Sequence, residues 1–130
     1  MRHWRLFFLL LILIAALSGI TSRTHPEFYP LFLQVHLGDA AWALAAYSVV
    51  GLLTPRRRPE LRIAIAFLLA AGVEFSQLWQ APWLTTIRQS QAGRWLIGTG
   101  FLWIDFLRYL GGILAAYGIE RIFRMIQHKR

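Results

Sequence analysis

Four long apolar segments constrain this 130-residue chain more than any other feature. Each has about 16–20 residues, close to the length that a helix needs to cross the hydrocarbon core of a membrane. Hydrophobic residues make up 57% of the chain, and a soluble domain of this size cannot bury so much apolar surface. The segments cover residues 6–21, 38–53, 61–80 and 101–119.

In lipid such segments must form helices, because a helix pairs all its backbone N–H and C=O groups internally, whereas a lone strand would leave these groups without partners. The sequence therefore predicts a single integral membrane domain, residues 1–130, with an all-α fold. We expect the four helices to form one bundle.

The basic residues indicate how the segments are oriented. Ten of the fourteen Lys and Arg residues form three clusters, which lie before the first segment, around the start of the third and after the fourth. With four spans these regions share one side of the membrane, and the positive-inside rule makes that side the cytoplasm. Both termini are then inside, and residues 22–37 and 81–100 form outer loops. The basic clusters are Arg2 and Arg5; Arg56, Arg57, Arg58 and Arg62; and Arg121, Arg124, Lys129 and Arg130.

The first apolar segment has a second interpretation. "MRHWR", followed by "LFFLLLILIAAL" and "SG", also has the pattern of a signal peptide, with a basic start, an apolar stretch and small residues. Cleavage would leave three spans and place the mature N-terminus outside. We favour an uncleaved first helix.

Composition and motifs exclude several classes of function. The formal net charge is +8, but no basic face carries interleaved aromatic residues outside a span, so we expect no nucleic-acid partner. The chain has no cysteine, which excludes disulfides, thiol catalysis and thiolate metal sites. Its histidines and carboxylates are too scattered to predict a metal site. No nucleophile with an evident base stands out, so we expect no cofactor and favour a role without catalysis.

Ionisable residues inside the predicted spans mark the candidate site, because such residues are costly in a membrane and usually functional. The charged residues within the spans all map to the outer half of the membrane, and Tyr47 is an uncharged polar residue that we group with them. Asp39 could instead be a simple N-cap, and Asp105 could pair locally with Arg108. The residues predicted to bind a ligand are Asp39, Glu74, Gln77, Arg94, Asp105, Arg108 and Tyr109.

Glu74 is the most unusual member of this set. The third segment runs from inside to outside, so Glu74 lies near its C-terminal end, where the helix dipole disfavours a carboxylate. Gln77 shares its helix face. Glu74 therefore requires a proton or a cation, and the outer cations available are Arg88, Arg94 and Arg108.

Three ordered stretches carry a resemblance to a known family. They are "HLGDAAWALAAYSVV", "VEFSQLWQ" and "RWLIGTGFLWIDFLRYLGG". Over about residues 37–118 the chain resembles a bacterial family of small four-span proteins, classed as a domain of unknown function. Its pattern falls on Gly38, Asp39, Tyr47, Glu74, Gln77, Arg94, Trp103, Asp105, Tyr109 and Gly112.

The same residues distantly resemble the VanZ-like family, which carries a similar Glu-x-x-Gln motif and a later Arg and Asp. Tyr109 stands near the place of an Asn in that family. The two resemblances imply four uncleaved spans in the bacterial inner (cytoplasmic) membrane.

These observations lead to one main hypothesis and two alternatives. The main hypothesis is an outward-facing polar and charged pocket that binds a cell-envelope molecule or a lipid headgroup. We expect membrane lipid and an envelope precursor as partners, and the small residues in the spans are compatible with a homo-oligomer. One alternative is a structural or accessory subunit whose polar cluster only holds helices together. The other is a small proton-coupled transporter in which Glu74 titrates.

Overall fold

A computed structural model describes residues 2–98 and 100–129, and over these residues the chain is all-helical. A short 3-10 turn, η1 (Pro26–Phe28), joins the first two helices. The α-helices are α1 (Arg2–Thr24), α2 (Leu31–Leu53), α3 (Pro59–Ser76), α4 (Pro82–Gln89), α5 (Gln91–Leu96) and α6 (Ile104–His128).

The four long helices α1, α2, α3 and α6 overlap the four predicted apolar segments, but several predicted boundaries are wrong. Helix α1 covers Arg2–Thr24 rather than residues 6–21. Helix α2 begins at Leu31 rather than at residue 38, within the region predicted as the first outer loop. Helix α3 ends at Ser76 rather than at residue 80. Helix α6 begins at Ile104 rather than at residue 101, and it continues through the basic residues to His128. Its extension is favoured by the ion pair between Glu120 and Arg124, which lie one turn apart.

The region predicted as the second outer loop contains two helices that the sequence analysis did not predict. Pro82 occupies the first turn of α4, where a missing N–H costs nothing. Ser90 is the N-cap of α5, and its hydroxyl accepts a hydrogen bond from the Gly93 N–H at 3.0 Å. Both helices are too short to cross a membrane, so neither stands out in the sequence as an apolar segment of that length.

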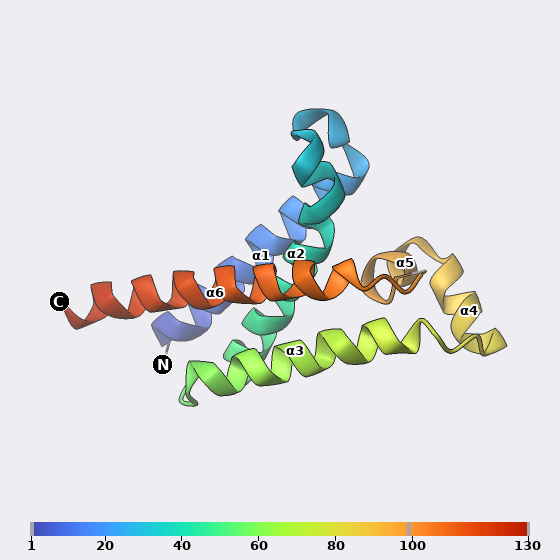
Figure 1. Ribbon diagram of the computed structural model, residues 1–130. Coiled ribbons are helices and arrows are strands. Elements are labelled where there is room, and N and C mark those ends of the chain that lie inside the picture. Colours follow the sequence, from blue (N-terminus) through green and yellow to red (C-terminus); the bar gives the residue numbers. More distant parts are fainter. Residues whose placement is uncertain (1, 99, 130) are drawn as a thin grey trace.

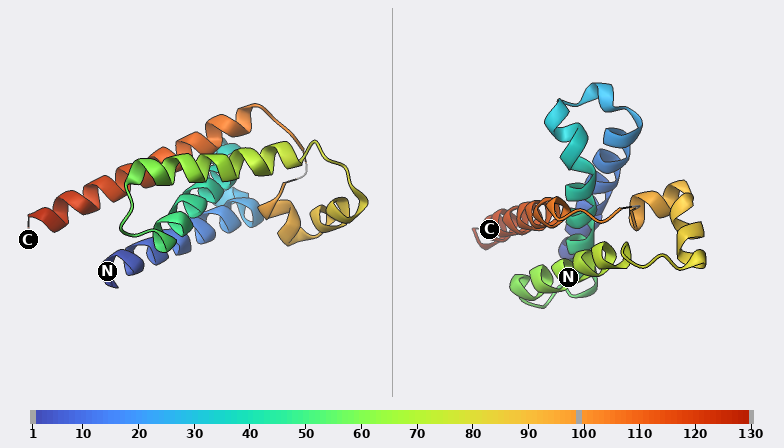
Figure 2. Two further views of the ribbon diagram at one scale, coloured as in Figure 1. Left: turned by 90° about the horizontal axis from the view of Figure 1, so that it is seen from below. Right: turned by 45° about the vertical axis from the view of Figure 1, so that its right-hand side comes forward.

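Helix α2 lies at the centre of the molecule, where it packs against α1, α3 and α6, and α3 also packs against α6. The α1–α2 hairpin crosses the α3–α6 pair (Figure 1). The start of α1, the α2–α3 turn and the end of α6 lie together at one end, which we call the basic end (Figures 1 and 2). Helices α4 and α5 lie far from it.

The core contains apolar side chains such as Phe8 and Ile113, but several charged side chains are buried with them. The largest completely buried side chains include Arg62, Glu74 and Glu120, residue types that are almost never fully buried unless paired. Large aliphatic side chains are exposed on all four long helices, as shown by Leu68 at 69% and Leu107 at 66%. By length and composition, α1 and α2 are apolar enough to cross a membrane.

The backbones of α2 and α6 approach most closely at Gly112. A Cβ atom at this position would collide with the main-chain carbonyl of Ala40. A Cβ at the neighbouring Gly111 would meet no heavy atom within 4 Å. Gly112 therefore permits the contact between the central helix and α6.

We predict that Gly112→Ala lowers the free energy of unfolding by ~1–3 kcal/mol, because the added methyl group overpacks the α2–α6 contact. Gly111→Ala is the matched control. It is expected to be neutral or to stabilise by up to ~1 kcal/mol, since alanine favours the helix over glycine. Thermal unfolding in mild detergent measures both. Equal melting temperatures for Gly112→Ala and the unaltered chain would contradict the close approach.

Candidate functional site

A cavity of about 280 Å³ opens among α1, α2, α3, α6 and the segment around α5. We call it the polar cavity. Its lining includes all the predicted ligand-binding residues except Glu74: Asp39, Gln77, Arg94, Asp105, Arg108 and Tyr109. Other lining residues were not predicted from the sequence, among them Arg23, Trp42 and Trp95. Arg23 was assigned to an outer loop, but it lies in the last turn of α1.

Arg108 is the centre of an ion-pair network in the cavity wall. Its Nη1 lies 2.5 Å from Asp105 Oδ1 and 3.5 Å from Asp39 Oδ2. Its Nε donates a hydrogen bond to His36 Nδ1 at 2.9 Å. The other Asp39 oxygen, Oδ1, lies 3.5 Å from Arg23 Nη2. The network thus connects α1, α2 and α6.

The ion-pair geometry tests two interpretations made from the sequence, one for Asp105 and one for Asp39. The predicted pair of Asp105 with Arg108 is confirmed. The N-cap interpretation of Asp39 is wrong, because α2 begins at Leu31 and Asp39 lies two turns inside it. Asp39 instead links the arginines of two neighbouring helices.

Arg94 differs from the other two arginines of the cavity. Within the described part of the chain it has no acidic partner, and its Nη2 donates to the Gln89 carbonyl at 3.2 Å. Its side chain is exposed. Three arginines (Arg23, Arg94 and Arg108) and two aspartates (Asp39 and Asp105) line the cavity, so its formal charge is +1. The arrangement can attract an anion and offer it a planar guanidinium fork.

Glu74 lies outside the cavity lining and is completely buried. Its carboxylate accepts one hydrogen bond from the Leu102 N–H at 2.8 Å and another from the Tyr109 hydroxyl at 3.0 Å. No arginine in the described residues pairs with it, so of the two alternatives expected for Glu74, a proton or a cation, the structure does not show the cation. Glu74 ties α3 to the beginning of α6 and supports Tyr109, which does line the cavity.

Arg88 was one of the cations expected near Glu74, but it has a different role. Its guanidinium donates to the Trp79 carbonyl at 2.8 Å and also to the Ser76 carbonyl. A cation at a helix C-terminus satisfies the last carbonyls and interacts favourably with the dipole. This cap explains why α3 ends at Ser76.

Gln77 joins α3 to the linker before α6. Its Nε2 donates to the Ile97 carbonyl at 2.7 Å, while its buried Oε1 has no hydrogen-bond partner among residues 2–98 and 100–129. Gly98 has a φ of 78°, and a Cβ there would collide with the Gln77 amide. Glycine is therefore required at 98 both for the left-handed backbone and for the close approach to Gln77.

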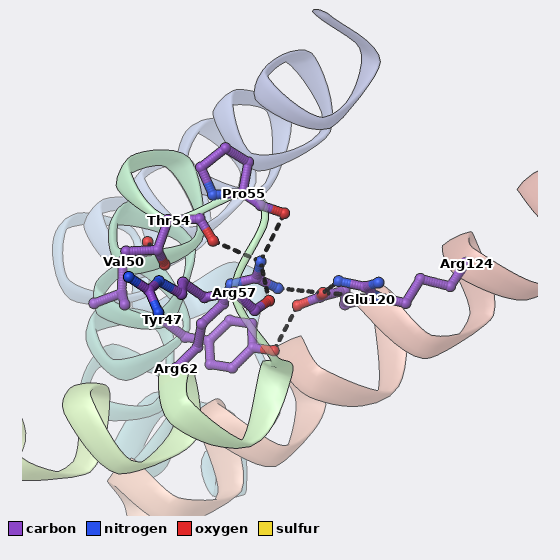
Figure 3. A network of polar contacts seen from close by, with 8 residues as sticks. All are labelled: Tyr47, Val50, Thr54, Pro55, Arg57, Arg62, Glu120 and Arg124. Carbon is purple, nitrogen blue, oxygen red and sulfur yellow. Dashed lines mark hydrogen bonds and ion pairs between the residues drawn. The ribbon is translucent and has the colours of Figure 1, made fainter. Parts of the chain in front are cut away.

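A second charged cluster, which was not predicted from the sequence, lies at the basic end. Glu120 Oε1 accepts hydrogen bonds from Arg62 and, at 2.7 Å, from Arg124 Nη2 (Figure 3). Glu120 Oε2 accepts one from the Tyr47 hydroxyl at 2.6 Å. Tyr47, Arg62 and Glu120 are completely buried. We call these four residues the Glu120 cluster, which joins α2, α3 and α6.

Arg62 also holds the turn between α2 and α3. Its Nη2 donates to the main-chain carbonyls of Thr54, Pro55 and Arg57 at 2.8, 3.1 and 2.9 Å (Figure 3). Its guanidinium carbon lies 5.2 Å from the centre of the Phe8 ring, so α1 contacts the cluster too. All four long helices therefore meet at Arg62.

Two assignments from the sequence are corrected here. Arg62 was counted among the basic residues that flank spans, but it is buried within the bundle. Tyr47 was grouped with the outer polar residues, but it belongs to the Glu120 cluster. The i, i+4 spacing of Glu120 and Arg124 was the available signal, although such spacing is equally common on solvated helix faces.

We predict that Arg62→Gln lowers the free energy of unfolding by ~3–5 kcal/mol, because removal of one partner leaves a buried carboxylate insufficiently compensated. Arg58→Gln, an exposed arginine one turn earlier, is the matched control and should change stability by less than ~0.5 kcal/mol. Detergent thermal unfolding distinguishes the two. A similar loss in both variants would mean that general charge, rather than the Glu120 cluster, stabilises the fold.

Comparison with known proteins identifies one family. The family described as "Protein of unknown function (DUF2809)" matches residues 28–113. The matched region contains every residue predicted to bind a ligand, whereas Glu120 and Arg124 lie beyond it. No solved structure matches the chain. In the described residues, no three His, Cys, Asp or Glu side chains gather as they would around a metal ion.

Proposed function

The chain belongs to this protein family, and we propose that it is a four-span membrane protein whose polar cavity binds an anionic group. The bound molecule is a component of the cell envelope or a membrane lipid, held by its headgroup. The observation that carries the proposal is the cavity itself, where three arginines face two aspartates and Arg94 has no acidic partner in the described chain.

The combination of buried charges and exposed aliphatic side chains supports four spans rather than two. Helices α3 and α6 together contain eight Asp, Glu and Arg residues, against four in α1 and α2, but Arg62, Glu74, Asp105 and Glu120 are all buried. The outward faces of α3 and α6 carry exposed aliphatic residues instead. A surface of this kind is unfavourable in water and suits lipid, in which polar residues face the bundle interior.

The basic end supports an orientation with the cavity away from the cytoplasm. Exposed cations gather at this end from the start of α1, the α2–α3 turn and the end of α6, among them Arg2, Arg56, Arg58 and Lys129. Cytoplasmic loops and termini carry such an excess of Lys and Arg. The polar cavity lies towards the opposite ends of these helices, near the outer surface of a bacterial inner membrane in the proposed topology.

The chemistry of the cavity favours a carboxylate or phosphate group. Asp39 and Asp105 hold Arg23 and Arg108 in place, which reduces the entropy that these side chains lose when a ligand binds. Arg94 is then available to form a bidentate contact with an anion.

We predict that Arg94→Gln weakens retention of the bound molecule by about tenfold or more, since a hydrogen bond to a charged group contributes ~1.5–3 kcal/mol. Native mass spectrometry of the protein, purified from membranes in mild detergent, measures the occupancy. The melting temperature should not change, because Arg94 is exposed and makes no ion pair within the described chain.

Arg56→Gln, an exposed arginine at the basic end, is the matched control and should retain the molecule fully. Equal occupancy in Arg94→Gln and in the unaltered chain would contradict the proposed site. A co-purified molecule without an anionic group would contradict it as well.

The proposed topology predicts a specific labelling pattern. The chain lacks cysteine, so His25→Cys and Arg57→Cys each introduce a single thiol, at positions that are both exposed. In intact cells a membrane-impermeant maleimide should label residue 25 and should label residue 57 only after permeabilisation. The reverse pattern would place the basic end outside.

A further inference from the structure

An apolar groove adjoins the polar cavity. It has a volume of about 190 Å³ and lies between α1 and α2. Arg23, Trp42, Trp95 and Leu96 line both the groove and the cavity, so the two spaces share a wall. The remaining lining of the groove is made chiefly of small residues: Ala15, Ala16, Gly19, Gly38, Ala41 and Ala45.

The small residues on α1 and α2 differ in what they contact. A Cβ at Gly19 would lie 3.3 Å from the Ala41 Cβ, and one at Gly38 would lie 2.7 Å from Arg23 Nε. These glycines therefore serve the packing of the hairpin and form the floor of the groove. Ala16 is exposed and Ala45 is half-buried, so these two residues border the open part.

The groove extends from the polar cavity towards the basic end. Arg23 and Ala15 are separated along α1 by about 12 Å at 1.5 Å per residue. On the antiparallel α2, Asp39 and Ala45 are separated by about 9 Å in the same direction. In the proposed orientation the polar cavity lies at the outer surface, and the groove descends from it into the hydrocarbon region.

We propose that one amphiphile occupies both spaces, namely a membrane lipid with an anionic headgroup. Its phosphate lies in the polar cavity beside Arg94, and one of its acyl chains lies in the groove between α1 and α2. This inference rests on the proposed function and deepens it by naming the class of ligand.

Two observations support a lipid over a free polar solute. The cavity carries a formal charge of +1 from the three arginines and two aspartates that line it, which complements a phosphodiester. The apolar groove continues from the cavity in the direction that an acyl chain takes in a bilayer. Trp42 and Trp95 stand where the two spaces meet, a position in which tryptophan commonly borders the headgroup region.

A series of alkyl phosphates tests the inference on the full-length protein in amphipol. Inorganic phosphate, ethyl phosphate, butyl phosphate and octyl phosphate share the charged group and differ in chain length. Isothermal titration calorimetry gives their dissociation constants. Burial of one methylene strengthens binding by about fourfold, so burial of four methylenes strengthens it by more than a hundredfold. Octyl phosphate has about six more methylenes than ethyl phosphate, and we expect it to bind at least a hundredfold more tightly.

Variants separate the two parts of the site. Arg94→Gln should weaken every alkyl phosphate by a similar factor. Ala16→Leu and Ala45→Leu should fill the groove, remove the dependence on chain length and leave ethyl phosphate unaffected. Ala115→Leu, at another exposed alanine on α6, is the matched control and should bind each alkyl phosphate as tightly as the unaltered chain does.

The possible failures are distinguishable. Equal affinity for ethyl and octyl phosphate, with loss of both in Arg94→Gln, would overturn the lipid inference and leave the proposed function in place. Absence of binding by every phosphate would contradict both. A dependence on chain length that persists in Ala16→Leu and in Ala45→Leu would place the chain outside the groove. If the protein is a dimer and Ala16→Leu dissociates it, the groove is occupied by a second copy of the chain rather than by a lipid.

Discussion

A charge removed from water is stable only when other groups in the protein compensate it. The rest of this structure depends on how the buried carboxylate of Glu120 is compensated. Its carboxylate receives donors from three helices: Tyr47 on α2, Arg62 on α3 and Arg124 on α6. Arg62 in turn binds the α2–α3 turn and lies against Phe8 of α1. Lipid supplies no hydrophobic force between helices, so such contacts select the arrangement of the four-span bundle that we propose.

The sequence was sufficient to predict the helical class and the place of the long helices, because runs of apolar residues between basic clusters are a strong signal. It also identified six residues that the fold brings to one cavity. Intramembrane polarity was the useful criterion there, since a charged residue within an apolar run is costly unless it has a partner or a function. Arg23 escaped this criterion because α1 continues beyond the apolar stretch that defined the predicted span.

The Glu120 cluster was missed for a different reason. Arg62 and Arg124 lie among other cations at the ends of apolar runs, where basic residues normally indicate topology. Nothing in a single sequence distinguishes a buried arginine from an exposed one such as Arg58. Burial depends on which helices meet, and that pairing arises from tertiary contacts such as the approach of Gly112 to Ala40. The end of α3 was mispredicted for the same reason, because it is capped by the distant Arg88.

The two charged clusters differ in a way that separates scaffold from site. In the Glu120 cluster, Arg62 and Glu120 are completely buried and the carboxylate oxygens are all engaged. Glu74 is likewise buried and accepts hydrogen bonds from two donors. In the polar cavity, Arg23 and Asp39 are 28% and 29% exposed and lie 3.5 Å apart, and Arg94 has no acidic partner among the described residues. Loose pairing and an excess cation leave the cavity able to exchange its internal contacts for those of an anionic headgroup, which the closed cluster at the basic end cannot do.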